Sequence, residues 1–100
     1  MNLGNAIKMC RARRNLTQAE LASRANVSVS YLSLLEKNKR DATVKTVKEL
    51  AVALNVPMGI LFFLAADKTE LTGIDQDLAA KLSHTALLFL NDTASAHTLI

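Results

Sequence analysis

The side chains best suited to chemistry gather in one stretch, residues 28 to 43. Short hydroxyl and apolar side chains come first and cations follow: Ser28, Val29, Ser30, Tyr31, Ser33 and Leu34, then Lys37, Lys39 and Arg40. Side chains of the first kind can hydrogen-bond to or touch the edges of bases in a DNA groove, and flanking cations can hold phosphates. The stretch therefore indicates recognition of a polyanion.

Other chemistries have weaker support in the sequence. Cys10 falls on a core position of a predicted helix, so we expect an inert buried thiol. His84 and His97 have no Cys, Asp or Glu around them at metal-ligand spacings, and both are expected at the surface. The run Asp75-Gln76-Asp77 has too few oxygens, and no glycine, for a calcium loop. Since no glycine-rich phosphate loop or catalytic triad is found either, we expect no enzyme, no cofactor and no metal.

The net charge of +3 hides an asymmetry along the chain. Residues 1 to 66 contain ten Lys or Arg against four Asp or Glu, whereas residues 67 to 100 contain two against five. Basic charge confined to one segment favours a polyanionic partner there and a different task for the rest. An ordinary solvated surface is the alternative explanation of the same charges.

Three features bear on the compartment. The most apolar stretch, residues 58 to 66, is much shorter than the roughly 20 residues of a membrane span. The N-terminus lacks the basic-then-apolar layout of a signal peptide. A single cysteine cannot form an internal disulfide, which fits a reducing environment. We therefore expect a cytoplasmic protein that does not contact a membrane.

Apolar residues recur at helical spacing through the first two thirds, which predicts five helices and no strands. The helices are expected from about residue 4 to Arg14, from the capping box Thr17–Glu20 to about Ala25, from Val29 to about Lys37, from Thr43 to Leu54, and from Pro57 onward. In the fourth helix Val44, Val47, Leu50, Ala51 and Leu54 form one predicted buried stripe. Asn15, Asn26, Asn38 and Asn55 each follow a predicted helix end, where Asn is the best substitute for a left-handed glycine.

The segment from Thr17 to Glu36 has the layout of a helix-turn-helix. Two short helices are joined by a tight turn at Asn26 and Val27, and small residues at Ala22 and Ala25 permit close approach of the helices. In such a motif the second helix lies in the major groove of DNA. The first 66 residues are therefore predicted to form one DNA-binding domain.

The C-terminal third is organised differently. Residues 67 to 74 are polar enough for a linker, Asp75 can cap a helix over 75–91, and residues 92 to 100 are expected to be a frayed tail. The helix has more apolar residues than one buried face requires, and so has the fifth helix. The predicted dimer interface consists of Ile60, Phe62, Phe63, Leu78, Leu82, Leu88 and Phe89. Folding of the last helix back onto its own domain is the alternative.

Motifs over residues 4 to 66 resemble the Cro and lambda-repressor family, often called the XRE family. The resemblance is carried by Ile7-Lys8-x-Cys10-Arg11, by Leu16 to Ala22, by Val27-Ser28 with Tyr31 to Arg40, and by Thr46 to Pro57. It implies an all-α, five-helix lambda-repressor-like DNA-binding domain, here with a C-terminal helix added. Asn stands at four positions where the family often has Gly, and Cys10 occupies a usual Leu site, a mild loosening of the core.

The resemblance also implies roles for individual residues. Gln18 would hydrogen-bond a phosphate, and Val29, Ser30, Ser33 and Leu34 would face base edges. Ser28 and Tyr31 would reach the backbone or a base, with simple capping and packing as the alternatives. The phosphate-holding group would be Lys37, Lys39, Arg40 and Thr43. Arg11 and Glu36 would pair between the first and third helices.

The sequence therefore predicts a transcriptional regulator that binds double-stranded DNA in a sequence-specific way, as a homodimer on a near-palindromic operator. Repressor and activator roles both remain open, and contact with RNA polymerase is possible. Two alternatives are a controller protein of a restriction-modification system and an antitoxin whose C-terminal part would grip a toxin.

Overall fold

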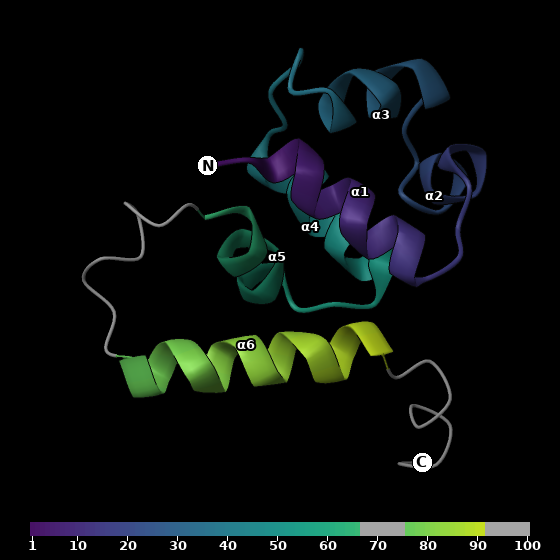
Figure 1. Cartoon of the computed structure of the whole chain (residues 1–100). Coiled ribbons are helices and arrows are strands. Elements are labelled where there is room, and N and C mark those ends of the chain that lie inside the picture. Colours follow the sequence, from purple (N-terminus) through teal and green to yellow (C-terminus); the bar gives the residue numbers. More distant parts are fainter. Residues whose placement is uncertain (67–75, 92–100) are drawn as a thin grey trace.

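In the computed structural model, residues 1–66 and 76–91 are described, and this part of the chain is helical, as predicted. The helices are α1 (Leu3–Arg13), α2 (Gln18–Arg24), α3 (Val29–Glu36), α4 (Val44–Leu54), α5 (Met58–Ala65) and α6 (Gln76–Asn91). Helix α3 lies at one end of the molecule and α6 at the other, with α1 and α4 between them (Figure 1). The predicted linker 67–74, the cap at Asp75 and the tail 92–100 lie outside the described residues.

Local side chains fix where the helices begin. Thr17 accepts a hydrogen bond from the backbone N–H of Glu20 at 3.0 Å, and the Glu20 carboxylate accepts one from the Thr17 N–H at 3.0 Å. Ser28 caps α3 through the Tyr31 N–H, and Thr43 caps α4 in the same way. These caps satisfy amide groups that the first turn leaves without a helical partner. The capping residues predicted from the sequence are confirmed.

Asparagines in the left-handed conformation end four helical segments. Asn15, Asn26, Asn38 and Asn55 have φ between 56° and 58°. The residue after each Asn donates its N–H to the carbonyl five residues earlier, as Val56 does to Ala51 at 3.0 Å. This bond turns the chain sharply and satisfies a terminal carbonyl of the helix. The four Asn positions predicted as helix ends are confirmed.

The core lies where α1, α2, α3, α4 and α5 meet. Its fully buried large side chains are Ile7, Leu21, Leu32, Leu50, Leu54 and Leu61, together with Cys10. The expectation that Val44 belongs to the buried stripe of α4 is wrong, because its side chain is 70 % exposed. Val44 stands in the first turn of α4, beside an open hollow rather than a neighbouring helix. The other four members of the stripe are buried.

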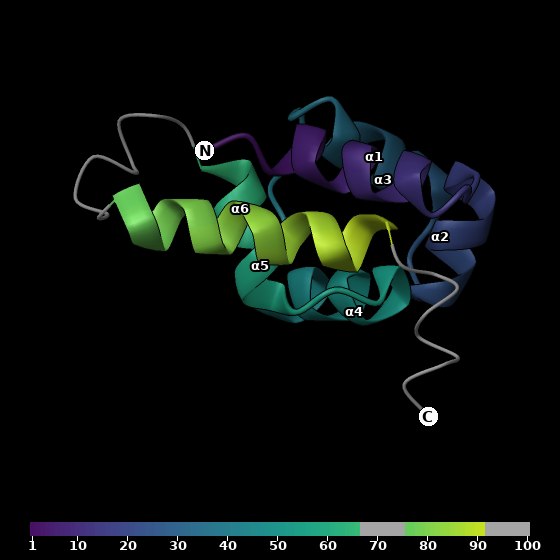
Figure 2. The ribbon, with the colours of Figure 1, turned by 60° about the horizontal axis from the view of Figure 1, so that its bottom comes forward.

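Helix α5 is covered more completely than the sequence suggested. It packs against α1 and α4, and α6 lies across it (Figure 2). Ile60 and Leu61 are therefore buried within one chain, while Phe62, Phe63 and Leu64 are half-buried. The prediction that Ile60 is available to a second chain needs correction, since only 7 % of it is exposed.

Helix α6 folds back on the rest of the described chain. It contacts α1 and α5, and Ala86 and Leu90 are buried on its inner side. Leu88 is two residues from Ala86, so at 100° per residue it points away from that contact, and it is 54 % exposed. Leu78 and Leu87 are exposed on other sides of the helix, at 48 % and 49 %. The surplus of apolar residues on α6 is therefore real but spread around it.

Among the described helices, no single one is long and apolar enough to cross a membrane. Together α4 and α5 meet the criteria of length and composition, but the chain bends by 104° between them.

Candidate nucleic-acid interface

The turn between α2 and α3 brings two short helices into close contact. Ala22 and Ala25 are almost fully buried, because their small side chains let the helices approach. On α3, Leu32 and Leu35 face the core. The opposite side carries the predicted recognition residues: Ser28, Val29 and Ser30 are exposed, and Tyr31, Ser33 and Leu34 are half-buried. This short outer face is uncharged.

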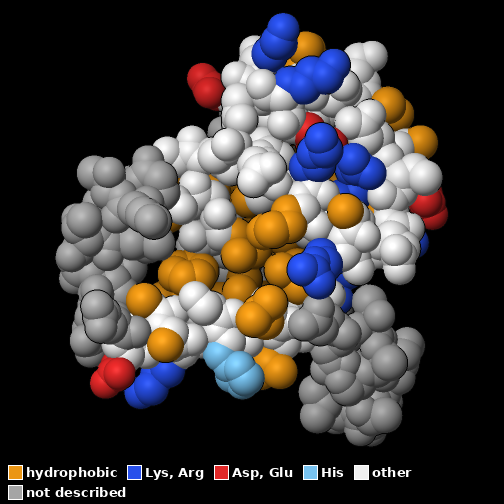
Figure 3. Space-filling model, in the orientation of Figure 1, with side chains coloured by type: hydrophobic (Ala, Val, Ile, Leu, Met, Phe, Trp, Pro, Cys, Tyr) orange, Lys and Arg blue, Asp and Glu red, His pale blue; other side chains and the backbone are white. Residues whose placement is uncertain are grey.

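Cations follow directly after this face. Lys37, Lys39 and Arg40 are exposed in the connector between α3 and α4, residues 37–43, which ends at the exposed cap Thr43. Figure 3 shows Lys and Arg side chains at the end of the molecule that carries this connector. The predicted base-facing and phosphate-holding residues therefore share one end of the fold, which α6 does not approach (Figure 1).

A buried carboxylate ties α1, α2 and α3 together. Arg11 donates from Nε to Glu36 Oε2 at 2.7 Å and from Nη2 to Oε1 at 3.1 Å, and Gln18 Nε2 donates to Oε1 at 3.0 Å. Only 3 % of the Glu36 side chain and 16 % of the Arg11 side chain are exposed. Arg11 also donates to the Leu16 carbonyl at 2.9 Å. The ion pair expected between Arg11 and Glu36 is thus present, and it fixes the Gln18 side chain beside α3.

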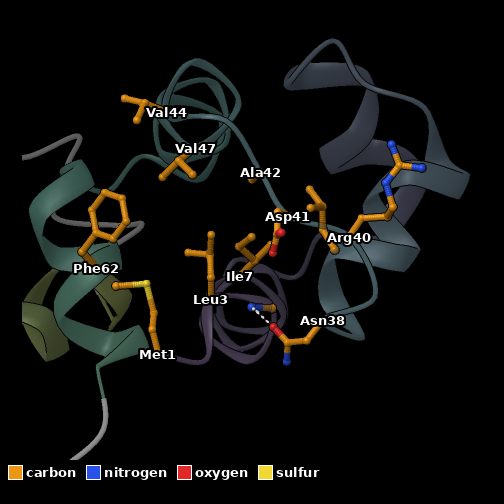
Figure 4. Close-up of a pocket in the computed structure, with 12 residues that line it drawn as sticks. Met1, Leu3, Ile7, Asn38, Arg40, Asp41, Ala42, Val44, Val47 and Phe62 are labelled. Carbon is orange, nitrogen blue, oxygen red and sulfur yellow. Dashed lines mark hydrogen bonds between the residues drawn. The ribbon is translucent and has the colours of Figure 1, made fainter. Parts of the chain in front are cut away.

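A close approach of α1 to α3 was not predicted from the sequence. Gly4 N–H donates to Asn38 Oδ1 at 3.1 Å (Figure 4), and Asn38 Nδ2 donates to Asn2 Oδ1 at 2.7 Å. A Cβ at Gly4 would stand 2.3 Å from the Leu35 carbonyl oxygen, so only glycine fits here. Asn38 therefore both ends α3 and fastens the connector to α1.

Arg14 is a second structural cation that the sequence did not reveal. Its Nε donates to the Leu54 carbonyl at 2.9 Å and its Nη2 to the Asn55 carbonyl at 3.1 Å. These bonds satisfy carbonyls at the end of α4 that have no helical partner. Arg11 and Arg14 therefore serve the fold, and the cations left for a polyanion lie elsewhere, notably in the connector.

Cys10 and Glu20, both within the described residues, have shifted pKa values with structural causes. Cys10 is fully buried, and burial raises the pKa of its thiol, against a smaller lowering by the Arg14 charge. His84 is exposed on α6, and His97 lies outside the described residues. Hydrogen bonds from Thr17 lower the pKa of the Glu20 carboxyl. Within residues 1–66 and 76–91, no three His, Cys, Asp or Glu side chains come together at a possible metal site.

Comparison with known proteins identifies the domain. The family model described as helix-turn-helix matches residues 7–61, more than half of the chain. The chain belongs to the helix-turn-helix family. The match spans α2 and α3 and most of the helices around them, so the family assignment rests on the same segment as the candidate interface.

Two of three similar proteins are regulators by name. The chain is 36 % identical over 61 residues to the immunity repressor protein of Bacillus phage phi105, of which it spans 42 %. The chain is also 43 % identical over 54 residues to the uncharacterized HTH-type transcriptional regulator y4dJ of Sinorhizobium fredii. This match covers 54 % of the chain and 70 % of that protein. The ImmF control region 10 kDa protein of the same phage is 30 % identical over 74 residues and 82 % covered.

A solved structure shows the same arrangement of helices. The clp gene regulator ClgR from Corynebacterium glutamicum aligns with a TM-score of 0.65 at 30 % identity, covering 84 % of this chain and 89 % of that one. A second structure of ClgR aligns with a TM-score of 0.62 over 64 % of this chain and 83 % of that one. The all-α fold and membership of the helix-turn-helix family are thereby established.

Proposed function

We propose that this protein is a sequence-specific repressor that inserts α3 into the major groove of duplex DNA. The observation that carries the proposal is the exposed, uncharged face of α3 with three cations directly beside it. A groove-reading helix needs short side chains that can approach base edges, and phosphate contacts fix its register. The repressor role is taken from the name of the phage relative, the immunity repressor protein.

The proposed contacts follow from exposure along α3 and its connector. Val29, Ser30, Ser33 and Leu34 face bases, with the hydroxyls hydrogen-bonding and the apolar groups meeting thymine methyls. The phosphate contacts come from Lys37, Lys39, Arg40, Thr43 and the backbone N–H of Gln18, whose side chain is already bonded to Glu36. Ser28 caps α3 and stands at its exposed start.

Salt dependence tests the phosphate contacts. Binding constants for duplex DNA should fall log-linearly with salt, and Lys39→Ala should reduce the slope by about 1 per bound copy of the chain, since each copy loses one phosphate contact. Lys81→Ala is the matched control, because it removes the same charge from α6, at the far end from α3. An equal change of slope in the two variants would refute the proposed docking face.

Dimerisation on a near-palindromic operator is the second part of the proposal. One recognition helix contacts too little DNA for tight binding, so two copies are expected with their α3 helices about 34 Å apart. The support comes from the apolar residues that remain accessible on α5 and α6: Phe62, Phe63, Leu78, Leu82, Leu88 and Phe89. Association between chains would remove such exposed apolar side chains from water.

Sedimentation tests this part. The intact chain should be a dimer at micromolar concentration, and a chain ending after Asp67 should associate more weakly because α6 is removed. A monomeric intact chain would contradict the dimer. An unchanged dimer of the shortened chain would place the interface on α5 and not on α6.

A further inference from the structure

The middle of the connector between α3 and α4 has little backbone support. The N–H of Lys39 still bonds to the Leu34 carbonyl at 2.9 Å, and the Val47 N–H bonds to the Thr43 carbonyl at 2.9 Å. Between them, within the described chain, residues 40–42 take part in no backbone–backbone hydrogen bond. The position of this segment therefore depends on side-chain contacts.

Tyr31 supplies two such contacts from α3. Its hydroxyl donates to the Asp41 carbonyl oxygen at 3.2 Å. The Arg40 guanidinium carbon lies 5.7 Å from the centre of the Tyr31 ring, within the range of a cation–π interaction. The ring is half-buried and packs against the core, so it is itself well supported.

The surroundings of residues 40–42 are consistent with support from Tyr31. Asp41 and Ala42 border a hollow of about 390 Å³ between the start of α1, α4 and α5, and of the two only Ala42 packs against the core. In Figure 4 the Arg40 side chain extends away from this hollow, on the opposite side from Leu3 and Phe62. Tyr31 therefore holds the segment from the α3 side.

We propose that Tyr31 is a positioning residue that presents Arg40 to a DNA phosphate, instead of contacting DNA itself. The inference rests on the proposed function in that Arg40 is taken to bind phosphate. A flexible segment and a long arginine side chain lose conformational freedom when they bind, and this loss weakens binding unless the free protein already holds them in place. The Tyr31 hydroxyl holds the backbone at Asp41, and the Tyr31 ring holds the guanidinium of Arg40.

Four variants separate this role from a direct contact. Tyr31→Phe removes the hydroxyl but keeps the ring, and Tyr31→Leu removes both; each is made with Arg40 present and with Arg40→Ala. The probe is one fluorescent duplex of about 20 base pairs, two helical turns of fixed arbitrary sequence, at low salt. An arbitrary sequence suffices because phosphate contacts do not depend on base identity.

With Arg40 present, Tyr31→Phe should weaken binding by about two- to tenfold, as expected for one hydrogen bond. The further change from Phe to Leu should weaken it by about two- to fivefold, as expected for one cation–π contact. In the Arg40→Ala background the step from Phe to Leu should disappear. Destabilisation of the fold by Leu cancels in this comparison, because the same substitution is present in both backgrounds.

A step from Phe to Leu of equal size in both backgrounds would overturn the proposal, because the ring would then act without Arg40. A missing step in both would overturn it as well. Backbone order parameters from NMR relaxation without DNA provide a second test. Tyr31→Phe should lower them at Asp41 and Ala42 but not at Leu32, and unchanged values would refute the contact between Tyr31 and the connector. Failure of the unchanged chain to bind any duplex would refute the proposed function, and with it the role of Arg40 on DNA. The relaxation experiment would still decide whether Tyr31 orders the connector.

Discussion

Two glycines should respond in opposite ways to the same substitution. Replacing Gly by Ala inside a helix normally stabilises by about 0.5–1 kcal/mol, because Ala loses less conformational freedom on folding. Gly59→Ala in α5 should show this gain, since an added Cβ would have no heavy atom within 4 Å. Gly4→Ala should instead destabilise, because its Cβ would stand 2.3 Å from the Leu35 oxygen and 2.8 Å from the Glu36 oxygen.

The size of the Gly4 effect follows from these distances. Ordinary contact begins near 3.4 Å, so α1 and α3 must separate by about 1.1 Å. Overpacking of this kind costs roughly 1–3 kcal/mol, and the bond from Gly4 N–H to Asn38 would weaken at the same time. After subtraction of the helix gain we expect a net loss of about 1–3 kcal/mol.

Thermal unfolding followed by circular dichroism measures both changes. At about 4–8 °C per kcal/mol for a chain of this size, Gly4→Ala should lower Tm by roughly 5–20 °C and Gly59→Ala should raise it by a few degrees. A Gly4→Ala protein as stable as the unchanged chain would show that α1 does not approach α3 so closely, and would refute the reasoning.

Three further predictions concern charged and thiol groups. Glu36→Ala should cost about 3–5 kcal/mol in urea unfolding because Arg11 is left without its partner, and a loss under about 1 kcal/mol would mean an effectively exposed pair. Hydrogen bonds from Thr17 lower the folded-state pKa of the Glu20 carboxyl, so the carboxylate contributes stability above the ordinary glutamate pKa and loses it as the pH falls through the lowered pKa. The difference in unfolding free energy between the unchanged chain and Glu20→Gln should therefore shrink in acid. A difference that stays constant with pH would contradict the capping box. Cys10 should react with a disulfide reagent only upon unfolding, because it is buried and its pKa is raised, and rapid labelling of the native protein would contradict this.

Features set by neighbouring residues could be predicted from the sequence. Thr17, Ser28 and Thr43 act on backbone groups within three residues, and the left-handed Asn55 depends only on its own helix end. Local rules are sufficient for such positions, so the helices were expected close to their observed bounds. The Arg11–Glu36 pair was different, because it followed from the family resemblance and not from spacing.

Contacts between distant segments could not be predicted in the same way. Gly4 and Asn38 are 34 residues apart, and Arg14 is 40 residues from the carbonyl of Leu54. Such pairs depend on how helices dock, which one sequence does not specify. The predicted burial of Val44 and the predicted availability of Ile60 to a second chain were wrong for a related reason. Periodicity shows which face of a helix is apolar, but it does not show whether another helix packs against that turn.

Selection of bound duplexes from a randomised DNA pool tests the central claim most directly. The unchanged chain should enrich one near-palindromic sequence with half-sites about one helical turn apart. Ser33→Ala should alter the preferred base at one or two positions of each half-site and leave the salt dependence of binding as it was. Enrichment of no sequence by the folded protein, or an unchanged site after substitution of every exposed residue of α3, would contradict recognition by that helix.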